Sequence, residues 1–149
     1  MSKLITTVSI ILLAASTAHA ADGLIVLKSN HPIKETVARL EKALDEKGMT
    51  VFAKIDHAAG AQKAGMVLDP AVLVVFGNPK VGTKLMQCSR TVAIDMPQKA
   101  LIWEDDNGQT WYGYNDPRYL MKRHGNEDCE KPADKIGNAL ANFARAATE

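Results

Sequence analysis

The fold of this chain is decided by the stretch Val72-Leu73-Val74-Val75-Phe76-Gly77-Asn78-Pro79-Lys80-Val81-Gly82-Thr83-Lys84-Leu85-Met86. Its first five residues form an unbroken apolar run, which is typical of a strand covered on both faces, so we predict a central strand at residues 72–76. Proline restricts the backbone of the residue before it, so Asn78-Pro79 fixes where the chain leaves this strand. Residues 80–87 are then predicted to form a short helix.

Upstream of this stretch, the pattern predicts a strand, a helix and a second strand. Residues 24–28 are predicted to form the first strand and residues 49–55 the second. Between them, residues 32–47 are predicted to form a helix, because apolar residues recur there at helical spacing. These residues are Ile33, Val37, Leu40 and Leu44. Gly48 suits the left-handed position that ends a helix.

Downstream, a hairpin and two helices are predicted. The turn residues 105–108, Asp-Asp-Asn-Gly, join a strand at 100–104 to one at 109–114. Asp116 and Pro117 are typical of a helix start, and a last helix is predicted at 133–147. Strands and helices without strict alternation predict an α+β fold, a mainly antiparallel sheet of about five strands with helices packed against it.

The amino terminus predicts export. Lys3 is followed by an apolar run and then by the small-residue site Ala18-His19-Ala20, which is typical of a secretory signal peptide at residues 1–20. The run is shorter than the roughly 20 residues that cross a bilayer, so we expect no stable membrane anchor. Residues 21–149 are then expected to form a single domain that is periplasmic or secreted.

The cysteine content agrees with export, and the charge argues against a nucleic-acid partner. In an oxidising compartment the two cysteines, Cys88 and Cys129, are expected to form one structural disulfide. Removing residues 1–20 takes away one lysine and no acid, so the formal charge falls from +1 to 0. A short basic cluster that includes His124 reads as a solvated helix face, and we expect no nucleic-acid partner.

Four segments together resemble a known family. They are 76–86, 111–120 (Trp-Tyr-Gly-Tyr-Asn-Asp-Pro-Arg-Tyr-Leu), 56–61 (Asp-His-Ala-Ala-Gly-Ala), and the run from Ile94 to Asp105. This pattern is similar to that of the domain-of-unknown-function 302 family and spans nearly all of the mature chain. The resemblance implies a fold and certain sequence positions that are unusual for a chain of this kind. It does not indicate which reaction, if any, the protein catalyses.

His57 is the first candidate for a functional residue. It follows a predicted strand and precedes small residues that leave space beside the imidazole, which suits a general base or a metal ligand. The alternative is a histidine that only caps the next turn. A hydrolase built on His57 with Asp56, Asn78 or Tyr114 is the minority interpretation, because adjacent residues on a strand point to opposite faces and Asp56 would orient His57 poorly.

Asn78, Tyr114 and His124 are the other candidates. Asn78 ends a buried strand, where its amide can point into a pocket or bond to a neighbouring turn. Tyr114 belongs to an aromatic cluster at a strand-to-helix junction that could line a ligand groove, line a dimer interface or form core. His124 lies where a helix ends, and the helix dipole is a sufficient reason for its position.

These residues favour a binding protein over an enzyme. We expect a small-molecule ligand, with haem or a metal ion bound through His57 as the named cofactors. Five methionines of the mature chain could line a soft apolar pocket or a copper site, or fill the core: Met49, Met66, Met86, Met96 and Met121. The alternative is a structural or oligomerising module. A homodimer is expected in either case, because a small domain has strand edges and aromatic surface to cover.

Overall fold

The computed structural model describes residues 21–126 and 129–149. In these residues one sheet contains five strands: β1 (Leu24–Lys28), β2 (Thr50–Asp56), β3 (Ala71–Gly77), β4 (Gln98–Glu104) and β5 (Thr110–Asn115). The strand order is β1-β5-β4-β3-β2, and every neighbouring pair is antiparallel. The predicted α+β class with an antiparallel sheet is confirmed.

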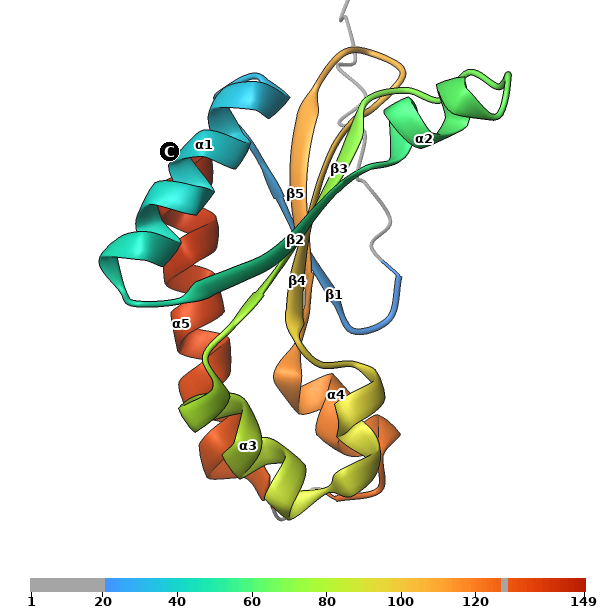
Figure 1. Cartoon of the computed structure of the whole chain (residues 1–149). Helices are drawn as coiled ribbons and strands as arrows, with labels where there is room; N and C mark the ends of the chain where they lie inside the picture. The colour runs from blue at the N-terminus through green and yellow to red at the C-terminus, as the bar shows by residue number, and fades with distance from the viewer. Residues whose placement is uncertain (1–20, 127–128) are drawn as a thin grey trace, which may run out of the picture.

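Most of the helices lie on one face of the sheet or below one end of it, and the short helix that follows β2 lies at the opposite end (Figure 1). They are α1 (Ile33–Glu46), α2 (His57–Lys63), α3 (Pro79–Cys88), the 3-10 helix η1 (Arg90–Ile94), α4 (Pro117–Arg123) and α5 (Glu130–Thr148). Helices α1 and α5 lie side by side against the sheet, and α3 and α4 lie past the end where β3 finishes.

One prediction about elements needs correction, and one helix was not predicted. Strand β3 was expected at the centre, but β4 takes that position and β3 lies next to the edge strand β2. The apolar run of β3 reflects a different arrangement: Val74 and Phe76 face the helices and are fully buried, whereas Leu73 and Val75 are half-buried on the other face. The segment after β2 forms helix α2, because the Asp56 carboxylate accepts a hydrogen bond from the Ala59 amide and caps it.

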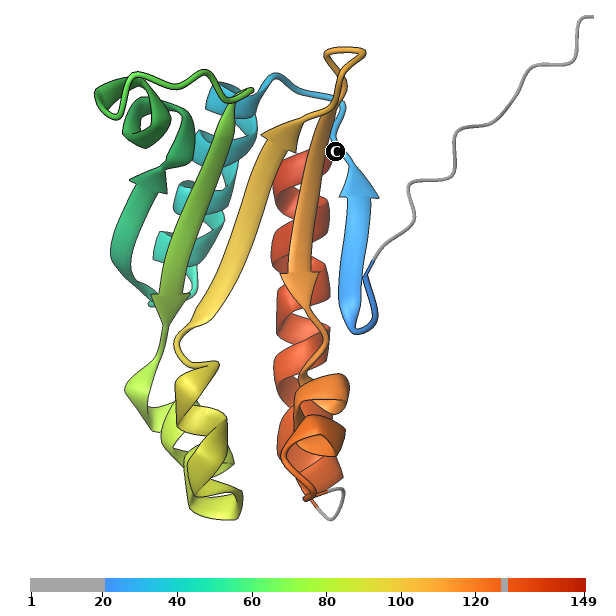
Figure 2. The ribbon, with the colours of Figure 1, turned by 90° about the vertical axis from the view of Figure 1, so that its right-hand side faces the viewer.

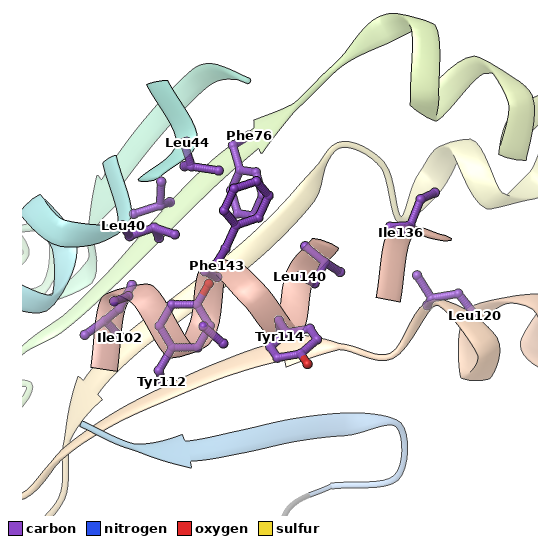
Figure 3. Packing of buried hydrophobic residues seen from close by; sticks show 14 of the residues in the cluster. Leu40, Leu44, Phe76, Ile102, Tyr112, Tyr114, Leu120, Ile136, Leu140 and Phe143 are labelled. Carbon is purple, nitrogen blue, oxygen red and sulfur yellow. The ribbon is translucent and has the colours of Figure 1, made fainter. Parts of the chain in front are cut away.

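The core lies between the sheet and helices α1 and α5 (Figure 3). Leu40 and Leu44 of α1 are fully buried, as their spacing predicts. Phe76 of β3 meets Phe143 of α5 edge to face, with ring centroids 6.0 Å apart. Burying one such side chain contributes about 1.5–3 kcal/mol, so this layer supplies much of the driving force for folding.

The predicted turn and cap residues do what their types suggest. Gly108 has φ of 72°, which the β4–β5 turn requires and which glycine adopts without strain. The Asp116 carboxylate accepts from the Arg118 amide at 2.9 Å, so α4 begins at Pro117 as predicted. These local interactions determine the turn that precedes β5 and the residue at which α4 begins.

The two cysteines form one disulfide, as predicted. Cys88 at the end of α3 is bonded to Cys129, which directly precedes α5, and their Cα atoms are 6.1 Å apart. The side-chain amide of Asn126 also donates to the Cys88 carbonyl. The bond therefore holds the far ends of α3 and α5 together, below the sheet.

The second face of the sheet lies open over β4 and β5 in the described part of the chain (Figure 2). Register places one apolar row across all five strands: Val26, Gly113, Leu101, Leu73 and Ile55. Trp103 and Trp111 are paired in the adjacent row. The ring of Trp103 lies so close to Gly113 that a Cβ there would be 3.0 Å from it, which explains the glycine.

Candidate functional site

A hollow in the described part of the molecule lies where β3 ends, between α3, the start of β4 and helix α5. Its volume is about 470 Å³, within the range of about 300–1,000 Å³ that is typical of small-ligand pockets. It is walled by Ile136, Leu140 and Phe143 of α5 on one side and by α3 on the other. The site therefore lies between residues that α3, the start of β4 and α5 contribute from distant parts of the chain.

Three methionines give this cavity its soft lining. Met49, Met86 and Met96 lie on its wall, each half-buried. Met121 is instead core, and Met66 is exposed. An unbranched thioether adapts its shape to what it contacts, so these side chains suit a flexible apolar ligand. Of the alternatives that the sequence leaves open, a soft pocket, a copper site or gap-filling core, the first fits three methionines and the last fits Met121, whereas Met66 belongs to neither.

The ring of Phe52 closes one edge of the cavity. A bulge in β2 places it off the regular register, and about half of its surface is exposed. A Cβ at Gly77 would be 3.3 Å from the Phe52 ring, so the glycine lets the ring lie across the end of β3. Phe52 is therefore a large apolar side chain that is both exposed and part of the cavity wall.

Asn78 is the predicted candidate that lines the cavity. Its Oδ1 accepts from the Lys80 amide at 3.0 Å and caps α3, while its Nδ2 donates to the Gly48 carbonyl at 3.4 Å. The bond to a neighbouring turn, one of the two alternatives that the sequence raises, is therefore present, and ligand contact by Asn78 stays a prediction. The residue fixes the mouth by joining the start of α3 to the end of α1.

His57 lies away from this cavity. It is exposed at the first position of the short helix α2, and it is absent from the cavity wall. Asp56 caps α2 rather than orienting the imidazole. Among the described residues no group of three or more His, Cys, Asp or Glu side chains could hold a metal ion. The role of His57 in ligand contact stays a prediction.

Tyr114 is a core residue on the helix-facing side of β5. Its side chain is 4% exposed and its ring lies edge-on to Tyr112, with centroids 6.2 Å apart (Figure 3). Burial raises the pKa of the Tyr114 hydroxyl, and the Asp116 carboxylate raises it further. A neutral phenol in this position stabilises packing and does not line the cavity.

His124 belongs to a separate polar cluster between α4 and η1. Its Nε2 lies 2.6 Å from Asp95 Oδ2, and its Nδ1 lies 2.9 Å from the Thr91 hydroxyl. Arg123 also pairs with Asp95, at 3.1 Å. Thr91, His124 and Asp95 are thus arranged in the order of a nucleophile, a base and an acid. None of them lines the cavity or the small hollow beside it. The cluster ties α4 to η1, near the disulfide.

The four candidates are therefore not brought together. Asn78 reaches the cavity, whereas His57, Tyr114 and His124 lie on α2, in the core and in the polar cluster. Sequence reasoning missed Lys80, Lys84 and Lys135, which surround a small hollow beside the cavity. A pattern was available for two of them, since Lys80 and Lys84 are one turn apart on the predicted helix 80–87.

Curated relatives share part of this chain. A fluoride-specific ion channel, FluC 1 of Brucella suis, is 46% identical over 102 residues, which are 68% of this chain and 40% of the relative. FluC 1 of Brucella abortus and FluC 2 of Brucella melitensis match equally over 38% of their lengths. The chain thus spans about two fifths of these relatives. In its described residues no helix has the length and hydropathy to cross a membrane.

A solved structure and a family match agree with the fold. An uncharacterised conserved DUF302 protein from Bacillus stearothermophilus superposes with a TM-score of 0.78 at 21% identity, over 85% of this chain and 99% of that one. At that identity the likeness concerns the fold alone. The family described as "Domain of unknown function DUF302" matches residues 25–147. The chain belongs to this family.

Proposed function

We propose that this protein is an exported binding protein that takes a small apolar ligand into the cavity between α3 and α5. The observation that carries the proposal is a cavity of about 470 Å³ walled by methionine, leucine, isoleucine and phenylalanine side chains. Each apolar Å² that a ligand removes from water there contributes roughly 25 cal/mol. A few polar groups on the wall, Asn78 and Gln98 among them, would orient what enters.

Export is the second part of the proposal. It rests on the signal-peptide pattern at residues 1–20, and the bond between Cys88 and Cys129 is consistent with an oxidising compartment. If the chain is exported, N-terminal sequencing of protein recovered from the periplasm or medium should begin at Ala21. Recovery of the intact precursor from the cytoplasm alone would contradict this part.

The sequence predicts that the ligand is haem or a metal ion bound through His57. The apolar cavity favours an organic ligand instead, because His57 is exposed on α2 and does not line it. Adding haem or copper to the purified protein and to folded His57→Ala would decide between the two. A spectral change that requires His57 would replace the cavity proposal for that ligand.

Filling the cavity tests the proposal directly. Gly82 of α3 lines it, and a Cβ there meets no atom within 4 Å, so Gly82→Leu should place an isobutyl group in the open space. We expect the affinity for the neutral fluorescent probe N-phenyl-1-naphthylamine to fall by about tenfold or more, since 1.4 kcal/mol of lost contact suffices. Leucine also favours helix over glycine, so the variant should fold.

Gly60→Leu is the matched control. Gly60 lies in helix α2 with the same open space around it, and it is not part of the cavity wall. Its substitution should leave probe binding unchanged. If wild type binds no neutral probe, or if Gly82→Leu binds as wild type does, the proposed function is wrong.

Self-association is a second candidate function, favoured by the open face of the sheet. The row Val26, Gly113, Leu101, Leu73 and Ile55 is apolar throughout, so two copies could place identical surfaces together around a twofold axis. Leu101→Glu should then convert dimer to monomer in light scattering at micromolar concentration. Val67→Glu, at a 99% exposed residue outside the row, should not. A monomeric wild type would end this candidate.

A further inference from the structure

Three lysines surround a small hollow beside the ligand cavity. Lys80 and Lys84 come from α3 and Lys135 from α5, around a space of about 50 Å³. Among the described residues, no acidic side chain lines this hollow or the large cavity, and every charged residue that lines either is a lysine. The cavity region is therefore cationic although the mature chain has no net formal charge.

The hollow and the cavity share a wall. Val81, Lys135 and Ile136 line both, so the apolar surface of the cavity passes directly into the cationic surface of the hollow. A ligand that lay across this wall would have an apolar part among the methionines and a charged end between α3 and α5. The lining therefore changes from apolar in the large cavity to cationic in the small hollow on the other side of the shared wall.

The lysines have no counter-ion among the described side chains. None of the six ion pairs in that part of the chain includes Lys80, Lys84 or Lys135. Asp134, the neighbour of Lys135 in sequence, is paired with Arg118 instead. Like charges one turn apart on a helix repel each other, so Lys80 and Lys84 would gain from an anion between them. All three side chains are exposed, so their ammonium groups are open to a negative group supplied from outside.

We infer that the cavity takes a single-chain anionic amphiphile of the fatty-acid class. Its alkyl chain lies among Met49, Met86 and Met96, and its carboxylate is held by Lys80, Lys84 and Lys135. This inference rests on the proposed function and adds the chemistry of the ligand to it. Charge-assisted hydrogen bonds from ammonium to carboxylate supply the specificity, and apolar burial supplies most of the affinity.

The test compares three ligands with the same ten-carbon chain. Decanoate, decanol and decyltrimethylammonium are each used to displace the neutral probe N-phenyl-1-naphthylamine from the folded mature protein. We expect decanoate to bind about tenfold more tightly than decanol, and the cation to bind least. The preference for decanoate should shrink at high salt, because exposed lysines are screened.

Variants assign the preference to the lysines. The triple variant Lys80→Gln, Lys84→Gln, Lys135→Gln should lose the preference for decanoate while it still binds decanol as wild type does. The control triple Lys34→Gln, Lys63→Gln, Lys122→Gln removes the same charge from exposed residues outside both hollows and should keep the preference.

The outcomes separate this inference from the proposed function. Equal binding of decanol and decanoate, or a preference that survives the first triple variant, would overturn the inference while leaving an apolar ligand site in place. Decanoate binding that Gly82→Leu does not reduce would place the anion elsewhere and overturn it too. Absence of neutral-probe binding in wild type would overturn the proposed function and this inference together.

Discussion

At the scale of single residues, the hydroxyl of Tyr112 is an unusual feature. The side chain is fully buried on β5, and its oxygen has no hydrogen-bond partner among the described residues. Burial raises the pKa of this hydroxyl, so it stays protonated at any ordinary pH. A buried polar group without a partner costs about 1–3 kcal/mol, and the neighbouring core must offset that cost.

Tyr112→Phe should therefore stabilise the protein. The ring keeps its packing against Tyr114 while the unpartnered oxygen is removed, so we expect the free energy of unfolding to rise by about 1 kcal/mol. Urea denaturation of the two proteins measures the difference. A clear loss of stability would mean that the hydroxyl bonds to a buried water in solution.

Asp105 gives the hairpin its dependence on pH. Its Oδ2 accepts from Trp111 Nε1 at 2.8 Å, and its Oδ1 accepts from the amides of Asn107 and Gln109. The hydrogen bond from Trp111, followed by that from Gln109, lowers the pKa of this carboxyl below its usual value of 3.8. The folded state therefore binds this proton less tightly than the unfolded state does.

Asp105→Asn should make the protein less sensitive to acid. Because the folded pKa is lowered, the carboxylate stabilises the wild type above pH of about 4, and that contribution is lost as pH falls through the folded pKa. The variant should be less stable than wild type at neutral pH, and the gap should close below pH of about 4. Thermal melts at several pH values measure it. Asp106→Asn, which makes none of these hydrogen bonds, should retain the wild-type profile.

At the scale of elements, the junction between β3 and α3 controls the mouth of the cavity. Asn78 both caps α3 and reaches the Gly48 carbonyl at the end of α1. The helix wall and the strand end are therefore positioned by one side chain. Loss of this residue should affect stability first, because an uncapped helix exposes backbone amides.

Asn78→Ala should lower the free energy of unfolding by about 1 kcal/mol, within the 0.5–2 kcal/mol that helix caps contribute. Asn78→Asp keeps the oxygen that accepts from the Lys80 amide and should retain most of the stability. Denaturant titration of both variants gives the comparison. If alanine and aspartate destabilise equally, the bond to Gly48 matters more than the cap.

At the scale of the whole molecule, the disulfide restrains the region below the sheet. It joins residues 41 apart, and on the chain-entropy estimate a loop of this length stabilises by at most about 4 kcal/mol. Replacing both Cys88 and Cys129 by serine should therefore lower the midpoint of urea denaturation. Denatured, unreduced wild type should titrate as having no free thiol, and two free thiols would contradict the bond.

Much of the fold could be predicted because it depends on near neighbours in the chain. The spacing of Val37, Leu40 and Leu44 determined α1, and Asp116-Pro117 determined the start of α4. Helix α2 was missed, since its cap by Asp56 follows a strand directly and its short alanine-rich segment has no apolar stripe. Local chemistry, when it is unambiguous, needs no tertiary information.

The order of the strands and the cavity depended on packing over long distances. The sequence alone determined the family, the antiparallel α+β class, the paired cysteines and the presence of adaptable methionines. Tertiary structure alone decided that Met49, Met86 and Met96 meet at one wall with Phe143, that His57 lies outside it, and that Lys80 and Lys84 meet Lys135. The physical reason is that capping hydrogen bonds and side-chain periodicity depend on residues a few positions apart. A cavity, in contrast, is the space that remains between elements that are far apart in sequence and do not pack completely against one another.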